Sequence, residues 1–441
     1  MQKQPLDTGP VDFDKAIIMV QNYISTRGQD IQNMLAMAMA GDYSSRQGII
    51  KYVESYLIDN QIEIIEMDAE SASKEIFNKL WGLDFLQEIY DDPTVNEIRV
   101  NGPNHIYVLR NLEPEPVPMS FQNNEHIMNI ISRMVMHDRG VSLNKSSPTI
   151  ESMRKDGTRI TATCPNVTEN FTFALRKHLN RVLSPEEMFT RNTINKQVWD
   201  VLQILVQGRC NILIAGGVGS GKTTLLRTLL SVTGDKERVV VLESDRELLL
   251  SKHFPERDIV EFEEHPNTGR TLENLFRTIL RYSPNRIIMG EFRGTGEARS
   301  AIEACLRGHE GSMATAHFNS PKEAIEGTAR LLLAEGYSVK PEIAAATVAS
   351  AFNVVVQMFG DTTRGIIKLD SITDIQIDGA QITYNDILKW TPYGDDYKKG
   401  VWENINYAGE RLINRVKRFG VSDEKLRKAG LIPKKGVAAC S

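Results

Sequence analysis

The chain has 441 residues, of which 41% are hydrophobic and 25% charged, and these ordinary globular proportions exclude disorder throughout, a collagen-like repeat and low complexity. Lys and Arg number 52 and Asp and Glu 57, so the net charge is −5, which excludes a basic field over the whole molecule for binding nucleic acid. At about 150 residues per domain, this length predicts roughly three domains.

Three features of the sequence indicate the cellular compartment of the protein. The N-terminal residues do not combine a basic start with an apolar core, so no secretory signal is visible. No apolar run approaches the roughly 20 residues that a helix needs to cross a bilayer. The cysteines lie far apart without a C-x-x-C pair, which fits a reducing compartment better than a zinc site or a disulfide framework: Cys164, Cys210, Cys305 and Cys440. We therefore expect a cytoplasmic protein.

Two segments are predicted in the first part of the chain. Apolar residues recur at three- and four-residue spacing within 13–24 and 47–58, which predicts that residues 1–84 are helical and amphipathic. Strand alternation and one helical period then mix over 85–180, which predicts a compact α+β domain. The strands are expected within 96–100, 105–109, 154–165 and 170–178, and the helix over 124–140.

A polar linker, 181–192, precedes the next domain. Within it Ser184, Pro185 and Glu187 have the spacing of a capping box with Pro in the first turn, which predicts a helix start. From 193 to 380, short apolar runs alternate with helical segments, a rhythm typical of a parallel sheet with right-handed crossovers. The strands are expected at 211–216, 238–243, 286–291 and, as a fourth candidate, 354–359. Residues 381–441 are expected to form a helical or irregular extension that is basic near its end.

The strongest motif lies between the first of these strands and the following helix. Gly216 to Thr223 match G-x-x-x-x-G-K-[S/T], a loop whose glycines let backbone N–H groups surround phosphate oxygens at a helix N-terminus. Lys222 is expected to bridge the β- and γ-phosphates of ATP, and the Thr223 hydroxyl to bind Mg²⁺. The nucleotide contacts are expected from Gly217, Gly219, Ser220, Gly221, Lys222, Thr223 and Thr224.

Acidic side chains follow two other predicted strands. Glu291 ends the strand 286–291, and because the carboxyl ends of parallel strands face the ligand crevice, it is expected to polarise water or to hold Mg²⁺ through water. Glu243 and Glu247 end the strand 238–243 and are expected to orient the attacking water. The alternatives are a solvated glutamate at a strand end and acids that complement a helix dipole. Asp245 is a weaker candidate.

Histidines and arginines add further candidates. His309 and His317 lie in a stretch rich in small residues, and His317 is expected to sense the γ-phosphate or to transmit its loss; a structural histidine is the alternative. Arg293, two residues after Glu291, is the arginine expected to act on the transferring phosphoryl group. Other arginines that an adjoining domain or subunit can supply are Arg154, Arg159, Arg176, Arg270, Arg277 and Arg281.

Four blocks in this order resemble the secretion and pilus ATPase superfamily of bacterial type II and type IV machines, and within it the CpaF-type branch of tight-adherence pili. They are GGVGSGKTTLL at 216–226, LESDREL at 242–248, RIIMGEFRG at 286–294 and GHEGSMATAHFNS at 308–320. The resemblance covers about residues 80 to 380. Ser244 stands where the family's acidic box usually has Asp, and the absence of a tetracysteine zinc insert argues against the type II secretion and pilus-extension branch.

The resemblance implies an α/β fold, with a RecA-like P-loop NTPase domain on a parallel-core sheet, preceded by the smaller α+β domain and the helical segment. It implies a homohexameric ring that hydrolyses ATP with Mg²⁺ and passes domain motion to an inner-membrane platform protein of a pilus or secretion machine. The protein is then expected at the cytoplasmic face of that membrane. The direction of transport, whether extension, retraction or export, stays open.

The end of the chain is basic. The last 31 residues contain nine Lys or Arg and two Asp or Glu, and they are expected either to form a solvated terminal helix or to meet anionic lipid headgroups or the platform protein.

A RecA-like motor on nucleic acid and a non-hydrolysing regulator are the alternative functions. No nucleic-acid partner is expected, because aromatic residues make up only 7% of an acidic chain.

Overall fold

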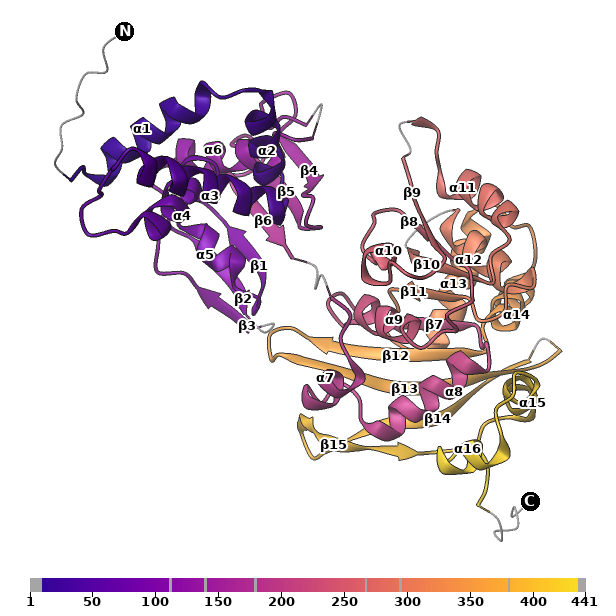
Figure 1. Cartoon of the computed structure of the whole chain (residues 1–441). Coiled ribbons are helices and arrows are strands. Elements are labelled where there is room, and N and C mark those ends of the chain that lie inside the picture. Colours follow the sequence, from indigo (N-terminus) through magenta and orange to yellow (C-terminus); the bar gives the residue numbers. More distant parts are fainter. Residues whose placement is uncertain are drawn as a thin grey trace. The chain divides into compact units, whose positions relative to one another are not determined.

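The chain forms two compact units, residues 1–180 and 181–441 (Figure 1). A computed structural model describes residues 10–110, 113–138, 141–177, 181–265, 268–292, 296–379 and 381–434. Within that part of the chain, no helix is both long enough and apolar enough to span a bilayer. Cys164, Cys210 and Cys305 are buried free thiols, and Cys440 lies outside the described residues.

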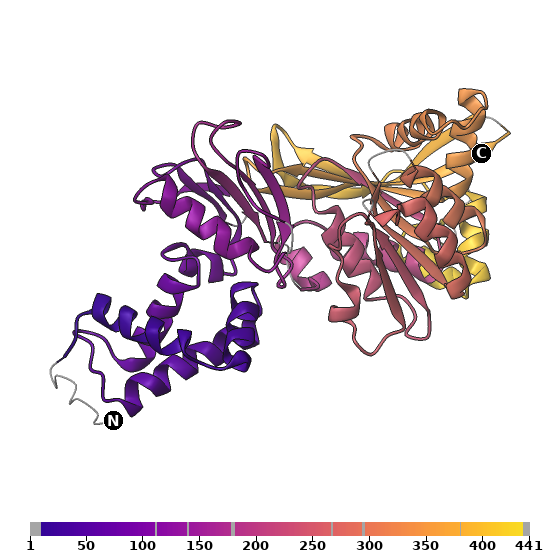
Figure 2. The ribbon, with the colours of Figure 1, turned by 90° about the horizontal axis from the view of Figure 1, so that it is seen from above.

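The first unit begins with four amphipathic helices, as predicted for this segment. They are α1 (Phe13–Ser25), α2 (Gln29–Met39), α3 (Tyr43–Asp59) and α4 (Ala69–Leu80), drawn in indigo and gathered at one end of the unit in Figure 2. Asp12, Asp42 and Asp68 cap three of them, each accepting a hydrogen bond from the backbone N–H three residues on. Their apolar faces share one core that includes Ile49 and Ile76.

An antiparallel sheet with one large helix follows in the same unit. The strand order is β3-β2-β1-β6-β5-β4, and α6 buries Ile127, Ile130 and Met134 in the core of this sheet. The elements are α5 (Leu86–Asp91), β1 (Val95–Val100), β2 (Ile106–Arg110), β3 (Glu113–Pro116), α6 (Asn124–Val135), β4 (Thr149–Met153), β5 (Arg159–Thr163) and β6 (Thr172–Arg176). Lys155 N–H donates to the carbonyl of Ala40, so the helical segment and the α+β segment, predicted separately, join in one unit.

The second unit is built on a nine-stranded sheet of order β15-β14-β13-β12-β7-β11-β10-β8-β9. The strands from β12 to β9 run parallel, whereas β13, β14 and β15 add antiparallel pairs. The strands are β7 (Ile212–Gly216), β8 (Val239–Glu243), β9 (Ile259–Glu263), β10 (Arg286–Phe292), β11 (Met313–Ala316), β12 (Val354–Asp361), β13 (Ile366–Asp378), β14 (Gln381–Tyr393) and β15 (Asp396–Asn404). This is the parallel-core α/β fold expected of a RecA-like P-loop domain.

Helices cover both faces of the sheet, which explains why its central strands are mostly apolar. Ile212 and Ile214 of β7 face one core, whereas Leu213 and Ala215 face the other. The first core includes side chains of α8 (Lys196–Gln207), α9 (Lys222–Leu230), α15 (Glu410–Arg418) and α16 (Asp423–Lys428). The second includes side chains of α11 (Leu272–Ile279), α12 (Glu297–Leu306), α13 (Pro321–Ala334) and α14 (Pro341–Ala351). The shorter helices are α7 (Pro185–Thr190), α10 (Leu250–His253) and the 3-10 turn Leu280–Tyr282.

Two sequence predictions have different outcomes in this unit. The helix start in the linker is confirmed, because α7 begins with a complete capping box between Ser184 and Glu187. The prediction of a helical or irregular extension from residue 381 is wrong for 381–404, which form β14 and β15. These strands bury only part of their side chains, among them Trp390 and Trp402, so their sequences lack the continuous apolar runs of the central strands.

A buried amide fixes the start of β7 against its neighbours. The Asn211 side chain accepts hydrogen bonds through Oδ1 from the N–H groups of Gly311 (2.9 Å) and Ser312 (3.2 Å). Through Nδ2 it donates to the carbonyl oxygens of Ala351 (2.8 Å) and Cys305 (3.3 Å). The residues before β7 and β11 and the end of α14 are thus tied at one point.

Replacing Asn211 by Ala is expected to lower the free energy of unfolding by about 3 kcal/mol or more, because several buried polar groups lose their partner and each costs roughly 1–3 kcal/mol. Urea denaturation measures this change. Asn274→Ala is the control, since its exposed side chain donates one hydrogen bond to Gly269. Equal midpoints for the two variants would contradict the structural role of Asn211.

Candidate functional site

The loop between β7 and α9 has the conformation that the glycine motif predicts. Gly219 (φ +72°) and Gly221 (φ +86°) adopt left-handed backbone conformations that favour glycine. A Cβ on Gly216 would lie 2.5 Å from Ser220 Oγ, whereas a Cβ on Gly217 would meet no described atom within 4 Å. The loop is therefore curled closely on itself and open on one side, as a backbone cradle for phosphate requires.

Lys222 crosses this cradle. Its side chain is only 6% exposed, and its Nζ donates to the carbonyl oxygens of Gly216 (3.1 Å) and Gly217 (3.0 Å). The same ammonium lies 3.3 Å from His317 Nδ1 and 3.9 Å from Glu291 Oε1. The lysine of the motif therefore contacts both the histidine and the carboxylate that the sequence predicts for the site.

Strand order explains why these three residues meet. β11 lies between β7 and β10, with Ala316 opposite both Ala215 and Phe292. His317 directly follows β11, and Glu291 lies near the end of β10, so both reach the edge at which the phosphate loop begins. His317 Nε2 contacts Glu291 Oε1.

The two contacts of His317 assign its tautomer. Because an ammonium can only donate, Nδ1 accepts from Lys222 and the proton lies on Nε2, from which it is donated to Glu291. Hydrogen bonds therefore run in one direction from the lysine through the imidazole to the carboxylate.

Two residues that the sequence analysis did not select hold the segment after His317. Gln357 Nε2 donates to the carbonyl of Phe318 (3.1 Å), and the Phe318 ring packs so closely on Gly327 of α13 that a Cβ there would lie 2.1 Å from it. The signal for Gln357 was present in the sequence, since it is the one polar residue in the apolar run 354–359.

Glu243, the last residue of β8, is buried against Gly290, the residue before Glu291. Its side chain is 3% exposed, and Oε1 accepts from the N–H groups of Glu247 (3.2 Å) and Leu248 (3.1 Å). A Cβ on Gly290 would lie 2.5 Å from the Glu243 side chain, so this glycine of β10 allows the close approach. Burial raises the pKa of Glu243 to about 8. The buried carboxyl therefore holds the loop that follows β8.

α9 is bonded both to that loop and to the start of the second unit. Arg227 donates to the carbonyl oxygens of Glu247 (2.6 Å), Leu248 (3.1 Å) and Arg181 (3.4 Å). Thr228 Oγ1 donates to the carbonyl of Leu183 (3.0 Å). The helix that begins at the phosphate loop is thus attached to the first residues after the other unit.

The remaining candidates are spread over the structure. Thr223 and Thr224 lie half-buried in the first turn of α9, Glu247 is half-buried, and Asp245 is exposed. His309 precedes β11, and its Nδ1 lies 2.9 Å from the carbonyl of Pro284, so β11 separates the two histidines. Arg293 lies outside the described residues. Of the other arginines, Arg154, Arg159 and Arg176 belong to the first unit and Arg277 pairs with Glu273 on the same helix.

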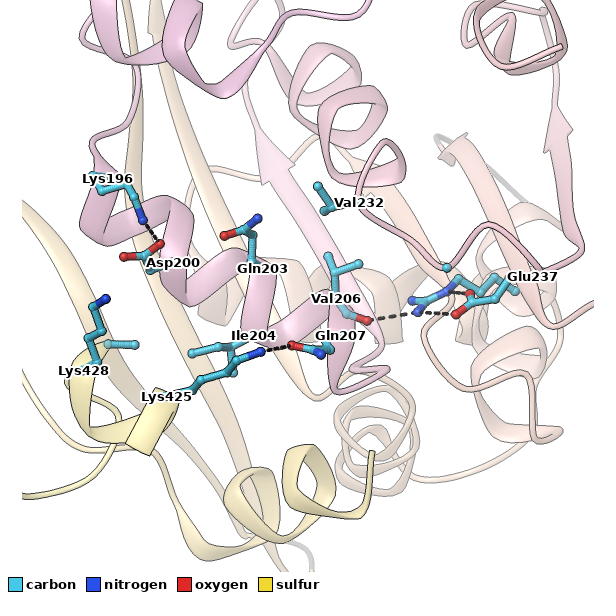
Figure 3. A pocket seen from close by; sticks show the side chains of 13 residues that line it. Lys196, Asp200, Gln203, Ile204, Val206, Gln207, Val232, Glu237, Lys425 and Lys428 are labelled. Atoms are coloured by element: carbon cyan, nitrogen blue, oxygen red, sulfur yellow. Dashed lines mark hydrogen bonds and ion pairs between the residues drawn. The ribbon is translucent and has the colours of Figure 1, made fainter. Parts of the chain in front are cut away.

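A separate pocket of about 490 Å³ lies at the opposite edge of the sheet, where the parallel strands begin (Figure 3). Its floor is fixed by Arg286, which is 1% exposed, pairs with Glu237 and donates to the carbonyl of Val206 (3.0 Å). Side chains from α8 and α16 form other walls, and Lys425 of α16 donates to Gln207 (3.4 Å). The pocket is therefore distinct from the phosphate loop, and Arg286 has a structural role in it.

Replacing Glu243 by Gln is expected to stabilise the protein increasingly as the pH rises. Because the folded-state pKa of about 8 exceeds the ordinary value of 4.5, the folded chain keeps a proton that the unfolded chain releases, and stability falls as the pH rises through this interval. Thermal unfolding between about pH 5 and pH 9 measures the difference, with the exposed Glu273→Gln as control. Parallel curves for E243Q and the parent chain would contradict the burial argument.

Sequence comparisons identify similar proteins. The family model described as "Type II/IV secretion system protein" matches residues 81–362. The type IV secretion system protein VirB11 of Brucella suis is 27% identical over 311 residues, covering 63% of this chain and 83% of that protein.

Two solved structures are similar in part. The crystal structure of the VirB11 ATPase of Brucella suis in complex with sulphate has a TM-score of 0.35 at 24% identity, covering 68% of this chain and 92% of that chain. The structure of the Legionella pneumophila ATPase DotB has a TM-score of 0.48 at 16% identity, covering 78% and 84%.

Proposed function

This chain belongs to the Type II/IV secretion system protein family, and on that premise we propose that it hydrolyses ATP to ADP and phosphate and so powers a secretion or pilus-assembly machine. The observation that carries the proposal is the cluster at the phosphate loop, in which Lys222 contacts His317 and lies 3.9 Å from Glu291. A phosphate cradle, a buried cation and a carboxylate within one cluster are the parts that phosphoryl transfer to water needs.

In the proposed reaction the backbone N–H groups of residues 217–221 bind the phosphates, and Lys222 neutralises charge on the β- and γ-phosphates. Glu291 accepts the proton of the attacking water. His317 links the base to the lysine, so a change at the γ-phosphate reaches both. Thr223, directly after Lys222, would hold Mg²⁺ with Glu291 acting through water, and the ion supplies charge neutralisation at the phosphates.

The acidic residues after β8 take different parts in this proposal. Glu247 orients the water, as the sequence predicts. Glu243 acts through the loop, because its buried carboxyl is bonded to the N–H groups of Glu247 and Leu248. Arg293 is still proposed as the arginine that acts on the transferring phosphoryl group.

The wider function is proposed from the family and the sequence resemblance. We propose a CpaF-type motor of a tight-adherence pilus or related system, working as a homohexamer against an inner-membrane platform protein at the cytoplasmic face. The basic tail contributes only in part to membrane contact, because Arg411 and Arg415 donate to the carbonyl oxygens of Ser350 and Arg209. Lys417 also pairs with Asp423, so Arg418 and Lys428, which are exposed, are the tail residues proposed to meet anionic headgroups.

Replacing Lys222 by Ala is expected to abolish ATP binding while the protein stays folded, because the cradle loses its buried cation. Titration with a fluorescent ATP analogue measures binding, and circular dichroism checks the fold. Lys196→Ala is the control, since that lysine pairs with Asp200 on α8 and its side chain is 70% exposed. Retained ATP binding in K222A would refute the role of the loop.

Replacing Glu291 by Gln is expected to leave ATP bound and to slow turnover by about 10²-fold or more, within the range of general-base catalysis. Phosphate release at saturating ATP measures turnover, with Glu326→Gln as control, since that half-exposed carboxylate pairs with Lys322 on α13. Normal turnover in E291Q would show that another residue is the general base. Stimulation of hydrolysis by DNA, with steep salt dependence, would favour the nucleic-acid motor instead.

A further inference from the structure

The phosphate loop has a second neighbour besides the strand that leads to His317. β12 pairs with β7 on its other side, with Met358 opposite Gly216. Because β7 ends at Gly216 and β12 continues to Asp361, the last residues of β12 run on beside the loop. The turn between β12 and β13 therefore lies on the flank of the loop opposite to β11.

Close contacts fix this turn against the loop. A Cβ on Gly360 would lie 2.6 Å from Ser220 Cα, so the two backbones touch. A Cβ on Gly219 would lie 3.0 Å from the Thr362 methyl carbon. The turn is thus a wall of the cradle, formed by residues 361–365.

One carboxylate organises the turn and orients an arginine. Asp361 Oδ1 accepts from the N–H groups of Thr363 (3.0 Å) and Arg364 (3.2 Å) and from the Thr363 hydroxyl (2.6 Å), and Oδ2 accepts from Arg364 Nε (2.6 Å). These bonds hold the pKa of Asp361 down, at about 2, so the turn keeps them at neutral pH. Arg364 uses only Nε in this pair, and its side chain is 55% exposed.

The two flanks of the loop differ in chemistry. The β11 flank carries His317 and Glu291, which in the proposed function meet the γ-phosphate end of the nucleotide. With the γ-phosphate on the β11 flank, the nucleoside of a triphosphate bound along the loop would lie toward the opposite flank, at the β12–β13 turn. Both Nη groups of Arg364, which have no protein partner in the described part of the chain, lie on this turn. A guanidinium fork matches phosphate oxygens and ribose hydroxyls.

We propose that the turn 361–365 forms the second wall of the nucleotide site and that Arg364 binds the α-phosphate and ribose of the bound nucleoside triphosphate. This inference rests on the proposed ATPase function. Arg364 lies just beyond residues 81–362, which match the family model.

The test is the affinity of the Arg364→Ala chain for ATP and for ADP, measured by titration with fluorescent analogues of both. Because the contact does not involve the γ-phosphate, both affinities are expected to fall by the same factor, about 10-fold or more for a lost charge-assisted hydrogen bond. R364K is expected to recover part of the loss, because lysine keeps the charge without the fork. Thermal unfolding without nucleotide is expected to be unchanged, since the side chain is largely exposed.

Arg307→Ala is the matched control, because Arg307 is equally exposed (56%) and pairs with Glu303, one turn before it at the C-terminal end of α12. Affinities equal to those of R307A would overturn the inference, and so would a loss confined to ATP, which would place Arg364 at the γ-phosphate. If the parent chain binds nucleotide and K222A does not, such a result rejects only the role of Arg364. If the parent chain binds none, the proposed function fails first.

Discussion

The buried ammonium of Lys222 is the constraint on which the site depends. A charge removed from water is stable only when it is hydrogen-bonded and paired, and this one is served by two carbonyl oxygens of its own loop and by His317 and Glu291 of neighbouring strands. Those partners reach it only if β11 lies between β7 and β10. The contacts of Lys222 therefore require this strand order in the second unit.

That edge is positioned by a sheet buried on both faces. Alternate residues of β7 enter two separate cores, so a shift of one residue would exchange every contact. Glycine permits the tightest approaches at the edge, as at Gly290 beneath Glu243 and at Gly360 against Ser220. A side chain at either position would move a strand end that carries part of the site.

Much of this edge follows from the sequence, and the exceptions have physical causes. The phosphate loop is local in sequence, and Glu291 and His317 are found because they follow apolar strands or lie in a distinctive polar stretch. The strand 313–316 (MATA) is short and made of small residues, so its place beside β7, and with it the contact of His317 with Lys222, is not readable. The role of Glu243 depends on Gly290 of another strand, and β14 and β15 alternate too weakly to be recognised as strands.

The attachment of α9 to the residues after the first unit has a mechanical consequence. Thr228 and Arg227 grip the carbonyl oxygens of Leu183 and Arg181, while the other end of the same helix begins at Lys222. A displacement of α9 along its axis would therefore have to break these two hydrogen bonds or move residues 181 and 183 with the helix. The phosphate loop at one end of α9 is in this way connected to the first described residues of the second unit.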